Sequence, residues 1–416
     1  MEVKPGYKQT EIGTIPEDWE LAELGIHATF KTGPFGSALH RSDYVEGGIP
    51  VVNPMQIVDG RIRPTSSMAI TEGAARKLSE FRLSAGDVVI GRRGDMGRCA
   101  VVRAEEEGWL CGTGSMIIRT GQSLDSEFLQ RMLSSPPVIA EIENASVGTT
   151  MINMNQGTLG RLLIPFPPDK TEQEAIATAL RDVDALIDSV ERLLTKKRDL
   201  KQGAMQELLR PHSGDVVRPL GEVSTLKGRI GWQGLKQTEF TMNADEPFLI
   251  TGMNFKDGAI AWDEVYHVSE ERYALAPEIQ LKAEDVLMTK DGTIGKLLYV
   301  ERIPYPGKAS LNSHLLLFRP IKQSYVPKYL YYQLGSQRFQ EFVDLHKSGT
   351  TFFGISQSSV AKYQVFLPSL GDQQRIARTL SDMDAEIAVL EERLSKARLL
   401  KQGMMQELLT GRIRLV

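Results

Sequence analysis

The sequence predicts an α+β protein in which one arrangement occurs twice: a mainly β module with short helices, followed by a long helix. Three observations lead to this prediction. Segments recur at an offset of about 200 residues, the most closely repeated segments have a heptad pattern, and the stretches between them hold short apolar runs separated by turns. The two long helices are expected to pair antiparallel as a coiled-coil spacer, with the two copies related by a pseudo-twofold axis.

The composition is that of a globular protein. The chain has 416 residues, 41% hydrophobic and 25% charged, which suggests two or three domains. The first residues lack an apolar targeting segment, and there is no run of about 18 apolar residues, so a cytoplasmic protein is expected. Cys99 and Cys111 lack the spacing of metal ligands, which favours buried free thiols.

The net charge bears on the class of ligand. With 49 Lys and Arg against 53 Asp and Glu, the chain has a formal charge of −4. DNA-binding domains are more often basic, because cationic side chains neutralise phosphates. The average counts mildly against DNA binding, but basic loops can still be present if the acidic residues lie elsewhere.

The long helices are the most closely repeated part of the chain. Residues 200–209 recur as residues 400–409 with nine of ten positions identical, and a Gln-x-x-Ile-Ala motif begins at both Gln173 and Gln373. We expect helices over about 171–209 and 371–409, each of about 38 residues and about 55 Å. Thr171, with Glu174 three residues later, is the expected N-cap of the first helix.

Apolar residues step by four and three along both helices, which is the pattern of a heptad seam. We expect the two seams to pack against each other. The alternative is that each helix covers the core of its own module, although a helix of 55 Å is longer than such a module needs. The predicted seam consists of Ile176, Leu180, Val183, Ile187, Val190 and Leu194 in the first helix and Ile376, Leu380, Met383, Ile387, Leu390 and Leu394 in the second.

The modules repeat more loosely than the helices. Residues 86–98 correspond to 284–296, each an apolar strand followed by a basic turn with glycines, and Gly-Thr-Thr occurs at both 148–150 and 349–351. The resulting division is a first module at 1–169, a helix and linker at 170–214, a second module at 215–369, and a helix and tail at 370–416. Expected strands include Val51–Val52, Val88–Ile90, Ala100–Val102, Met116–Ile118, Leu162–Pro168, Phe248–Ile250, Val286–Met288, Leu298–Val300, His314–Phe318 and Tyr363–Pro368.

The loops between these strands hold the candidate ligand-binding residues. Cationic and hydroxyl side chains occur there beside glycines that allow close approach of a ligand to the backbone, as phosphate or base-edge contacts require. Each loop alone is no more than a polar turn, but they recur at matched positions. The candidates for DNA contact are Lys31, Thr32, Gly33, Phe35, Ser37, His40, Arg41, Arg92, Arg93 and Arg98 in the first module and Lys227, Arg229, Trp232, Lys236, Lys290, Thr293, Lys296, Lys347, Ser348, Thr350 and Thr351 in the second.

The sequence offers no recognisable catalytic or metal-binding motif. It contains no G-x-x-x-x-G-K-[ST] phosphate loop, no H-x-x-x-H or H-E-x-x-H pair and no G-x-S-x-G. Asn53-Pro54-Met55 resembles a base-flipping N-P-P-[FY] element in two letters only and is expected to be a turn at the end of a strand. We therefore expect no catalytic residue, no metal site and no cofactor in this chain.

Several segments taken together indicate a family: YKQTEIGTIPEDW at 7–19, TGPFGS at 32–37, SGTT at 348–351 before Ile355-Ser356, the two Gln-x-x-Ile-Ala helices, and LLTGRIRL at 408–415. With these segments the chain resembles, over nearly its whole length, the specificity subunits of Type I restriction-modification enzymes. The resemblance implies that each module is a target recognition domain for one half of a bipartite, asymmetric DNA site. The helices would space these domains and dock two adenine methyltransferase subunits, motor-nuclease subunits would join them, and S-adenosylmethionine, ATP and Mg would be used by those partners.

Two other classes stay open at this point. The modules could bind protein or glycan while the helices merely dimerise, or the chain could be an enzyme whose nucleophile and base are not recognised. DNA binding through basic loops should weaken steeply as salt rises, whereas a protein or glycan interface should not. A separation of about 55 Å between modules would correspond to roughly one and a half turns of B-DNA at 34 Å per turn, which predicts an unread spacer between the half-sites.

Overall fold

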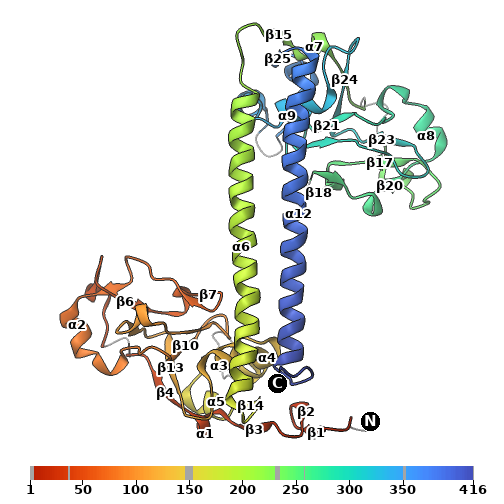
Figure 1. Cartoon of the computed structure of the whole chain (residues 1–416). Helices are drawn as coiled ribbons and strands as arrows, with labels where there is room; N and C mark the ends of the chain where they lie inside the picture. The colour runs from red at the N-terminus through yellow and green to blue at the C-terminus, as the bar shows by residue number, and fades with distance from the viewer. Residues whose placement is uncertain are drawn as a thin grey trace. The chain divides into compact units, whose positions relative to one another are not determined.

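The structure is a computed structural model that describes residues 4–35, 38–145, 153–229, 235–256, 258–349 and 353–415. The chain divides into two compact units, a first unit of Met1–Glu191 with Arg393–Val416 and a second unit of Arg192–Glu392. Each unit therefore combines one module with the start of the helix that follows it and the end of the other long helix (Figure 1).

The two long helices have the predicted extent. Helix α6 spans Lys170–Leu208 and helix α12 spans Leu370–Leu408, 39 residues each, within one residue of the expected bounds. Ion pairs show their direction: in the first unit Asp184 pairs with Lys401 at 2.7 Å and Glu191 with Arg398 at 2.6 Å. The residue with the higher number in α6 thus pairs with the residue with the lower number in α12. The two helices are therefore antiparallel, as predicted.

The predicted seam is divided between two kinds of packing. Val190, Leu194 and Leu394 are buried. Apart from the first two seam residues of each helix, the other predicted seam residues are half-buried. The first two seam residues of each helix instead belong to the hydrophobic core of a module, so the alternative prediction holds for the first turns of each helix. These four residues are Ile176 and Leu180 in the first unit and Ile376 and Leu380 in the second.

The predicted N-cap of α6 is wrong. Helix α6 begins at Lys170, and the carboxylate of Asp169 accepts hydrogen bonds from the backbone N–H of Thr171, at 2.9 Å, and from its hydroxyl. A carboxylate one residue before the helix accepts a hydrogen bond from a free N–H, and its negative charge interacts favourably with the positive end of the helix dipole. Ser369 has the same place before α12, where its Oγ accepts from the N–H of Asp372 at 3.2 Å.

The first unit is built on an antiparallel four-stranded sheet in the order β11-β10-β13-β4. A second four-stranded sheet has the order β12-β6-β9-β5, and three two-stranded ribbons pair β1 with β2, β3 with β14 and β7 with β8. The strands are β1 Tyr7–Thr10, β2 Gly13–Pro16, β3 Glu20–Glu23, β4 Ala28–Thr32, β5 Tyr44–Val45, β6 Ile49–Val52, β7 Ile57–Val58, β8 Arg61–Ile62, β9 Ala69–Ile70, β10 Val88–Gly91, β11 Cys99–Val101, β12 Leu110–Cys111, β13 Ser115–Thr120 and β14 Leu163–Phe166. The short helices are α1 Leu24–His27, α2 Glu72–Lys77, α3 Ser126–Leu133, α4 Pro136–Ala145 and α5 Gln156–Gly160.

The second unit repeats this plan with a four-stranded sheet in the order β16-β24-β21-β22. Its other sheets are β20-β17-β23, β15-β25 and β18-β19. The strands are β15 Val216–Pro219, β16 Ser224–Lys227, β17 Phe248–Ile250, β18 Phe255–Lys256, β19 Ala259–Ile260, β20 Tyr266–His267, β21 Val286–Thr289, β22 Leu297–Tyr299, β23 Ala309–Leu311, β24 Leu315–Pro320 and β25 Gln364–Leu367. The short helices are α7 Leu220–Val223, α8 Glu270–Ala274, α9 Pro327–Leu334, α10 Gln337–His346 and α11 Gln357–Val360. Each strand named from the sequence is present in the structure, with ends shifted by a residue or two.

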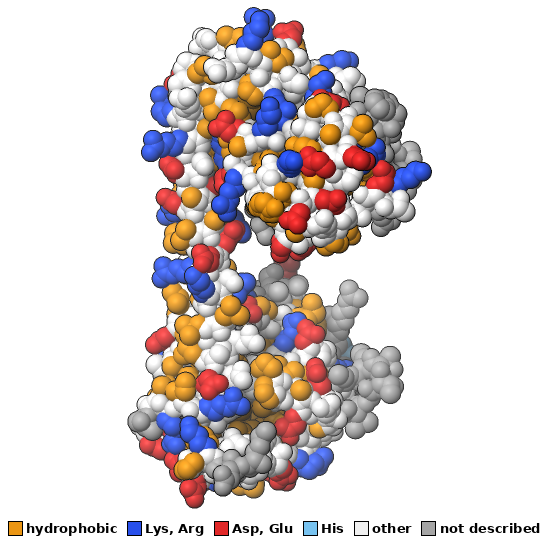
Figure 2. Space-filling view, turned by 90° about the vertical axis from the view of Figure 1, so that its right-hand side faces the viewer, with side chains coloured by type: hydrophobic (Ala, Val, Ile, Leu, Met, Phe, Trp, Pro, Cys, Tyr) orange, Lys and Arg blue, Asp and Glu red, His pale blue; other side chains and the backbone are white. Residues whose placement is uncertain are grey.

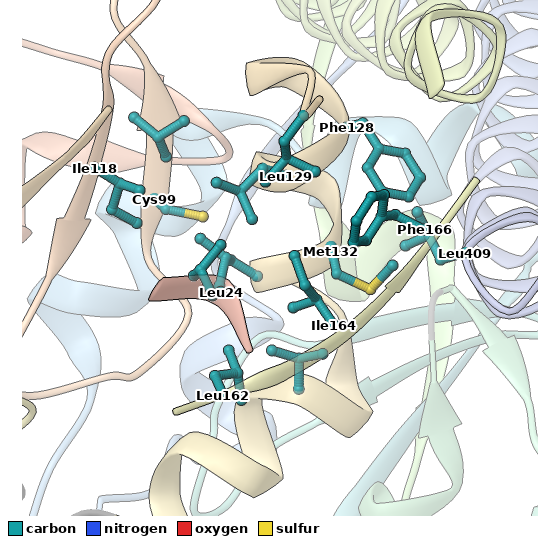
Figure 3. Packing of buried hydrophobic residues seen from close by; sticks show 14 of the residues in the cluster. Leu24, Cys99, Ile118, Phe128, Leu129, Met132, Leu162, Ile164, Phe166 and Leu409 are labelled. Atoms are coloured by element: carbon teal, nitrogen blue, oxygen red, sulfur yellow. The ribbon is translucent and has the colours of Figure 1, made fainter. Parts of the chain in front are cut away.

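The largest core of the first unit joins the module to the long helices. Figure 3 shows Phe128 and Met132 of α3 beside Phe166 of β14 and Leu409, which follows α12 directly. Because these side chains come from distant parts of the sequence, their burial fixes the end of α12 to the start of α6 within this unit. Cys99 lies in the same core, and burial raises the pKa of its thiol to about 12. Both cysteines are buried free thiols, as predicted.

A buried glutamine explains why Gln-x-x-Ile-Ala occurs twice. Gln173 is fully buried; its Nε2 donates to the carbonyl oxygens of Ser123 and Pro167 at 2.9 and 2.8 Å, and its Oε1 accepts from the N–H of Asp125 at 2.7 Å. Gln373 makes the equivalent bonds in the second unit, to Val326 and Pro368. These glutamines therefore hold each long helix to its own module.

Candidate nucleic-acid interface

The predicted ligand loops of the first unit meet at one edge of the central sheet. Strand β10 ends at Gly91, which pairs with Ser115 at the start of β13, and Thr32 at the end of β4 pairs with Met116. The turn at 92–98 and the loop after β4 are thus neighbours because the strands before them are. In each unit, we call the group of loops that adjoin these strand ends, or the equivalent strand ends of the second unit, the loop edge.

Backbone hydrogen bonds hold the loop edge of the first unit together. The N–H of Arg92 donates to the carbonyl oxygen of Gly114 at 2.9 Å, and the N–H of Met154 donates to the carbonyl oxygen of Arg92 at 3.0 Å. Nε2 of Gln156 donates to the hydroxyl of Thr32 at 3.0 Å. Segments near residues 32, 92, 114 and 154 are therefore cross-linked.

The second unit builds the same loop edge. The N–H of Lys290 donates to the carbonyl oxygen of His314 at 2.9 Å, and the N–H of Ile355 donates to the carbonyl oxygen of Lys290 at 2.8 Å. Nε2 of Gln357 donates to the carbonyl oxygen of Leu226 at 3.0 Å. The structure thus brings the turn at 290–296 and residues 353–355 together, as it brings the turn at 92–98 and Met154 together.

The candidate arginines of the first unit differ in what holds them. Arg92 donates twice to Oδ1 of Asn153, at 3.2 and 3.0 Å, and partial burial, with the nearby Arg93, lowers the pKa of its guanidinium. Arg98 forms an ion pair with Asp95, three residues earlier. Arg93 is exposed. The turn therefore presents one exposed cation and two cations engaged within the protein.

The candidate residues of the second unit show the same division. Lys290 pairs with Asp291 at 2.9 Å and Lys347 with Asp344 at 2.8 Å. Ser348 exchanges two backbone hydrogen bonds of 2.9 Å with Gly354. The remaining candidates Lys227, Lys236, Thr293 and Lys296 are exposed.

Two candidate residues have structural contacts of their own. Arg229 is only 6% exposed and donates from Nε to the carbonyl oxygen of Leu311 at 2.9 Å, and burial lowers the pKa of its guanidinium. A side chain so placed argues against a DNA contact. Gly33 was expected to admit a ligand, but a Cβ there would lie 1.9 Å from the carbonyl oxygen of Gly112, so the glycine is required by packing within the protein.

The other candidates of the first unit lie around this edge. Lys31 pairs with Glu80 and lies over the ring of Phe81, and the ring of Phe35 is 77% exposed. The exposed His40 starts a loop in which its N–H donates to Asp43 at 2.6 Å. The remaining predicted contacts, Ser37, the side chain of Arg41, Trp232, Thr350 and Thr351, lie outside the described residues.

Sequence reasoning missed a polar contact that joins the modules to both long helices. In the first unit Asp184 of α6 accepts from Arg131 of α3 and from Lys401 of α12. In the second unit Asp384 of α12 accepts from Lys201 of α6 and, at 2.7 Å, from the hydroxyl of Tyr332. The identity of Asp184 and Asp384 in the repeat was the available signal, but nothing in the sequence indicates their partners.

The charge of the molecular surface is mixed rather than of one sign. On the face that Figure 2 shows, Lys and Arg side chains lie among Asp and Glu side chains over both units. This agrees with the formal charge of −4 and means that attraction to phosphates has to come from local groups such as the loop edges.

The chain matches a family model described as the Type I restriction modification DNA specificity domain twice, over residues 16–196 and 214–398. The chain therefore belongs to the family of Type I restriction-modification specificity subunits and has two target recognition domains. It is 24% identical over 98% of its length to the putative type I restriction enzyme MjaX specificity subunit of Methanocaldococcus jannaschii, covering 96% of that protein. The MjaVIII specificity subunit of the same organism is 23% identical, with 96% of this chain and 94% of that protein covered.

The fold is that of solved specificity subunits. The crystal structure of the Type I restriction-modification system S subunit from M. genitalium superposes with a TM-score of 0.61 at 17% identity, covering 98% of both chains. Family membership assigns this chain DNA sequence recognition rather than catalysis. Among the described residues, no group of three or more His, Cys, Asp or Glu is placed to hold a metal ion. In the same part of the chain, no helix has the length and apolar character needed to cross a membrane.

Proposed function

We propose that each unit reads one half of a bipartite, asymmetric DNA site through its loop edge, and that α6 and α12 set the length of the unread spacer between the half-sites. The observation that carries the proposal is the loop edge itself. It is built twice from matched strands and matched backbone hydrogen bonds, while most of the side chains that it presents differ between the units. A constant frame with variable side chains suits two different base sequences.

The long helices suit a second role, the docking of two methyltransferase subunits. Exposed apolar side chains on a helix favour a further protein partner. Leu193, Leu200, Val389, Leu399 and Leu400 are between 42% and 64% exposed. Three other apolar residues of α6, Leu186, Met205 and Leu208, are half-buried. The methyltransferase subunits would bind S-adenosylmethionine, and motor-nuclease subunits would use ATP and Mg.

The test is to map methylated adenines in a host genome after expressing this chain with a matching methyltransferase. The expected result is one motif made of two short specified sequences separated by a gap of fixed length and unspecified bases. A continuous motif, or methylation independent of sequence, would contradict the proposal.

Docking is tested separately by substituting the exposed helix leucines. Leu200→Glu together with Leu400→Glu is expected to abolish copurification of the methyltransferase, because two charges would have to be buried in an apolar contact. Gln202→Glu with Gln402→Glu, which changes exposed polar side chains on the same helices, is the matched control and should leave copurification intact.

A further inference from the structure

Two methionines have equivalent and exposed places beside the two loop edges. Met55 is 81% exposed and Met253 is 84% exposed. Each is the middle residue of a 3₁₀ turn, Pro54–Gln56 after β6 and Gly252–Asn254 after β17. The offset between them, 253 minus 55 or 198, equals the offset between Arg92 and Lys290 on the two basic turns.

The two turns share their methionine and nothing else. Residues 53–56 are Asn-Pro-Met-Gln, and residues 251–254 are Thr-Gly-Met-Asn. The structure explains two of the three differences, because Asn53 with Gln56 and Thr251 with Asn254 form alternative capping boxes of the same turn. It gives the methionine no such structural task, since most of its side chain contacts solvent.

Both turns are held rigidly. The N–H of Asn53 donates to Oε1 of the buried Gln56 at 3.1 Å, and the N–H of Thr251 donates to Oδ1 of the buried Asn254 at 2.8 Å. Each methionine is therefore presented to solvent from a fixed turn, which lowers the entropy that a ligand contact would cost.

Both turns also lie next to the strand ends that lead into the candidate cationic turns. Oδ1 of Asn53 accepts from the N–H of Gly114 at 3.3 Å, and the carbonyl oxygen of Gly114 accepts from Arg92. In the second unit a Cβ at Gly252 would lie 3.0 Å from Cγ2 of Thr289, the residue before Lys290. The methionines thus belong to the surface that we propose faces DNA.

An apolar side chain on such a surface has a defined target on DNA. The 5-methyl group of thymine is the apolar group that bases offer in the major groove, and methionine is flexible and polarizable enough to pack against it. The two half-sites differ in sequence, but methylation of an adenine in each requires an A·T pair in each. The methionine is the residue that the two turns share, and the A·T pair is the base pair that the two half-sites would share.

We propose that Met55 and Met253 each pack against the 5-methyl group of the thymine that pairs with the adenine to be methylated. This inference rests on the proposed function, because it places the loop edges on DNA. It adds a specificity-determining residue in each unit and the chemical group that this residue recognises.

The experiment uses this chain assembled with its methyltransferase subunits and duplexes that carry the mapped site. In one duplex deoxyuridine replaces the thymine opposite the target adenine of the half-site read by the second unit, which removes only the 5-methyl group. The wild-type complex is expected to bind this duplex about fourfold more weakly, the factor given by burial of one methyl-sized group. Met253→Ala should weaken binding to the thymine duplex at least as much, and the deoxyuridine should then cause no further loss.

Two controls define the outcome. Met242→Ala removes another methionine of the second unit, 70% exposed, and should leave the fourfold effect of deoxyuridine unchanged. Additive losses from Met253→Ala and deoxyuridine, with the preference for the mapped site intact, would overturn this inference alone. A wild-type complex with no preference for the mapped site would overturn the proposed function as well.

Discussion

The two units are almost the same in their helices and different in their loops. Residues 200–209 and 400–409 are identical at nine of ten positions, whereas the turns at 92–98 and 290–296 share only their two glycines. Gly94, Gly97, Gly292 and Gly295 all have positive φ, between 71° and 85°, a backbone conformation that favours glycine. The frame of each turn is therefore retained while its charges change, as the proposed reading of two different half-sites would require.

The contacts of the repeated aspartates show a finer difference between the units. Asp184 accepts from two cations, and its partner Arg131 is 13% exposed. Asp384 accepts from Lys201 and from the hydroxyl of Tyr332, and burial, with this contact to Asp384, raises the pKa of that tyrosine. The same helix position therefore balances two cations in the first unit, one of them largely buried, and one cation and a buried neutral hydroxyl in the second.

The largest expected effect comes from removing these aspartates. Asp184→Ala leaves Arg131 buried without a counter-charge and is expected to destabilise the first unit by about 3 kcal/mol, because an uncompensated buried charge is costly. Asp384→Ala should destabilise the second unit by only about 1 kcal/mol, because it removes a hydrogen bond from a buried neutral hydroxyl and an ion pair with Lys201, which is more exposed than Arg131. Urea unfolding measures the loss of unfolding free energy. Hydrogen exchange of α3, in the first unit, and of α9, in the second, shows which unit is destabilised. Asp182→Ala, at an exposed position of α6, is the control; equal losses in the two units would refute the comparison.

A smaller effect on stability should come from the titration of the two buried thiols, which belong to the first unit. Both cysteines lie there, and burial raises the pKa of the Cys99 thiol to about 12, against about 8.5 in an unfolded chain. The folded state keeps a proton that the unfolded state loses, so stability is retained below about pH 8.5 and falls as pH rises toward 12. At pH 9 the loss is expected to be about 1 kcal/mol per thiol.

The control for this pH effect is a variant with Cys99→Ala and Cys111→Ala. Its stability should be compared with that of the wild type between pH 7.5 and 9 by urea unfolding. The slope above pH 8.5 should flatten in the variant. An identical slope in both proteins would show that the thiols do not titrate on unfolding.

The smallest expected effect is on DNA binding, and it should differ between the exposed cations and the paired cations of the loop edges. Arg93→Ala and Lys296→Ala are each expected to weaken DNA binding two- to threefold at about 0.1 M salt and to reduce the slope of log K against log salt by about 0.9, the amount for one phosphate contact. Lys290→Ala should change the slope less, because Lys290 already pairs with Asp291. Titrations at several salt concentrations measure the slopes, and a larger change for Lys290 than for Lys296 would contradict this assignment.

The sequence predicted the frame better than the contacts. The ends of α6 and α12 were predicted to one residue because a heptad pattern with terminal caps marks a helix locally. The cap itself was assigned to Thr171 instead of Asp169, since both residue types cap helices and only the geometry distinguishes them. The burial of Arg229 and the exposure of Met55 depend on strands far away in the sequence, so local pattern could not reveal either.

Shortening both long helices tests the proposal that they set the spacing of the half-sites. Deleting residues 190–196 and 390–396 removes one heptad from each helix and nearly preserves the faces that pack, because seven residues make almost two whole turns. The helix pair loses about 10 Å. Methylation mapping should then show the same two half-site sequences with a spacer shortened by up to about three base pairs. An unchanged spacer in a variant that still methylates DNA would contradict the account.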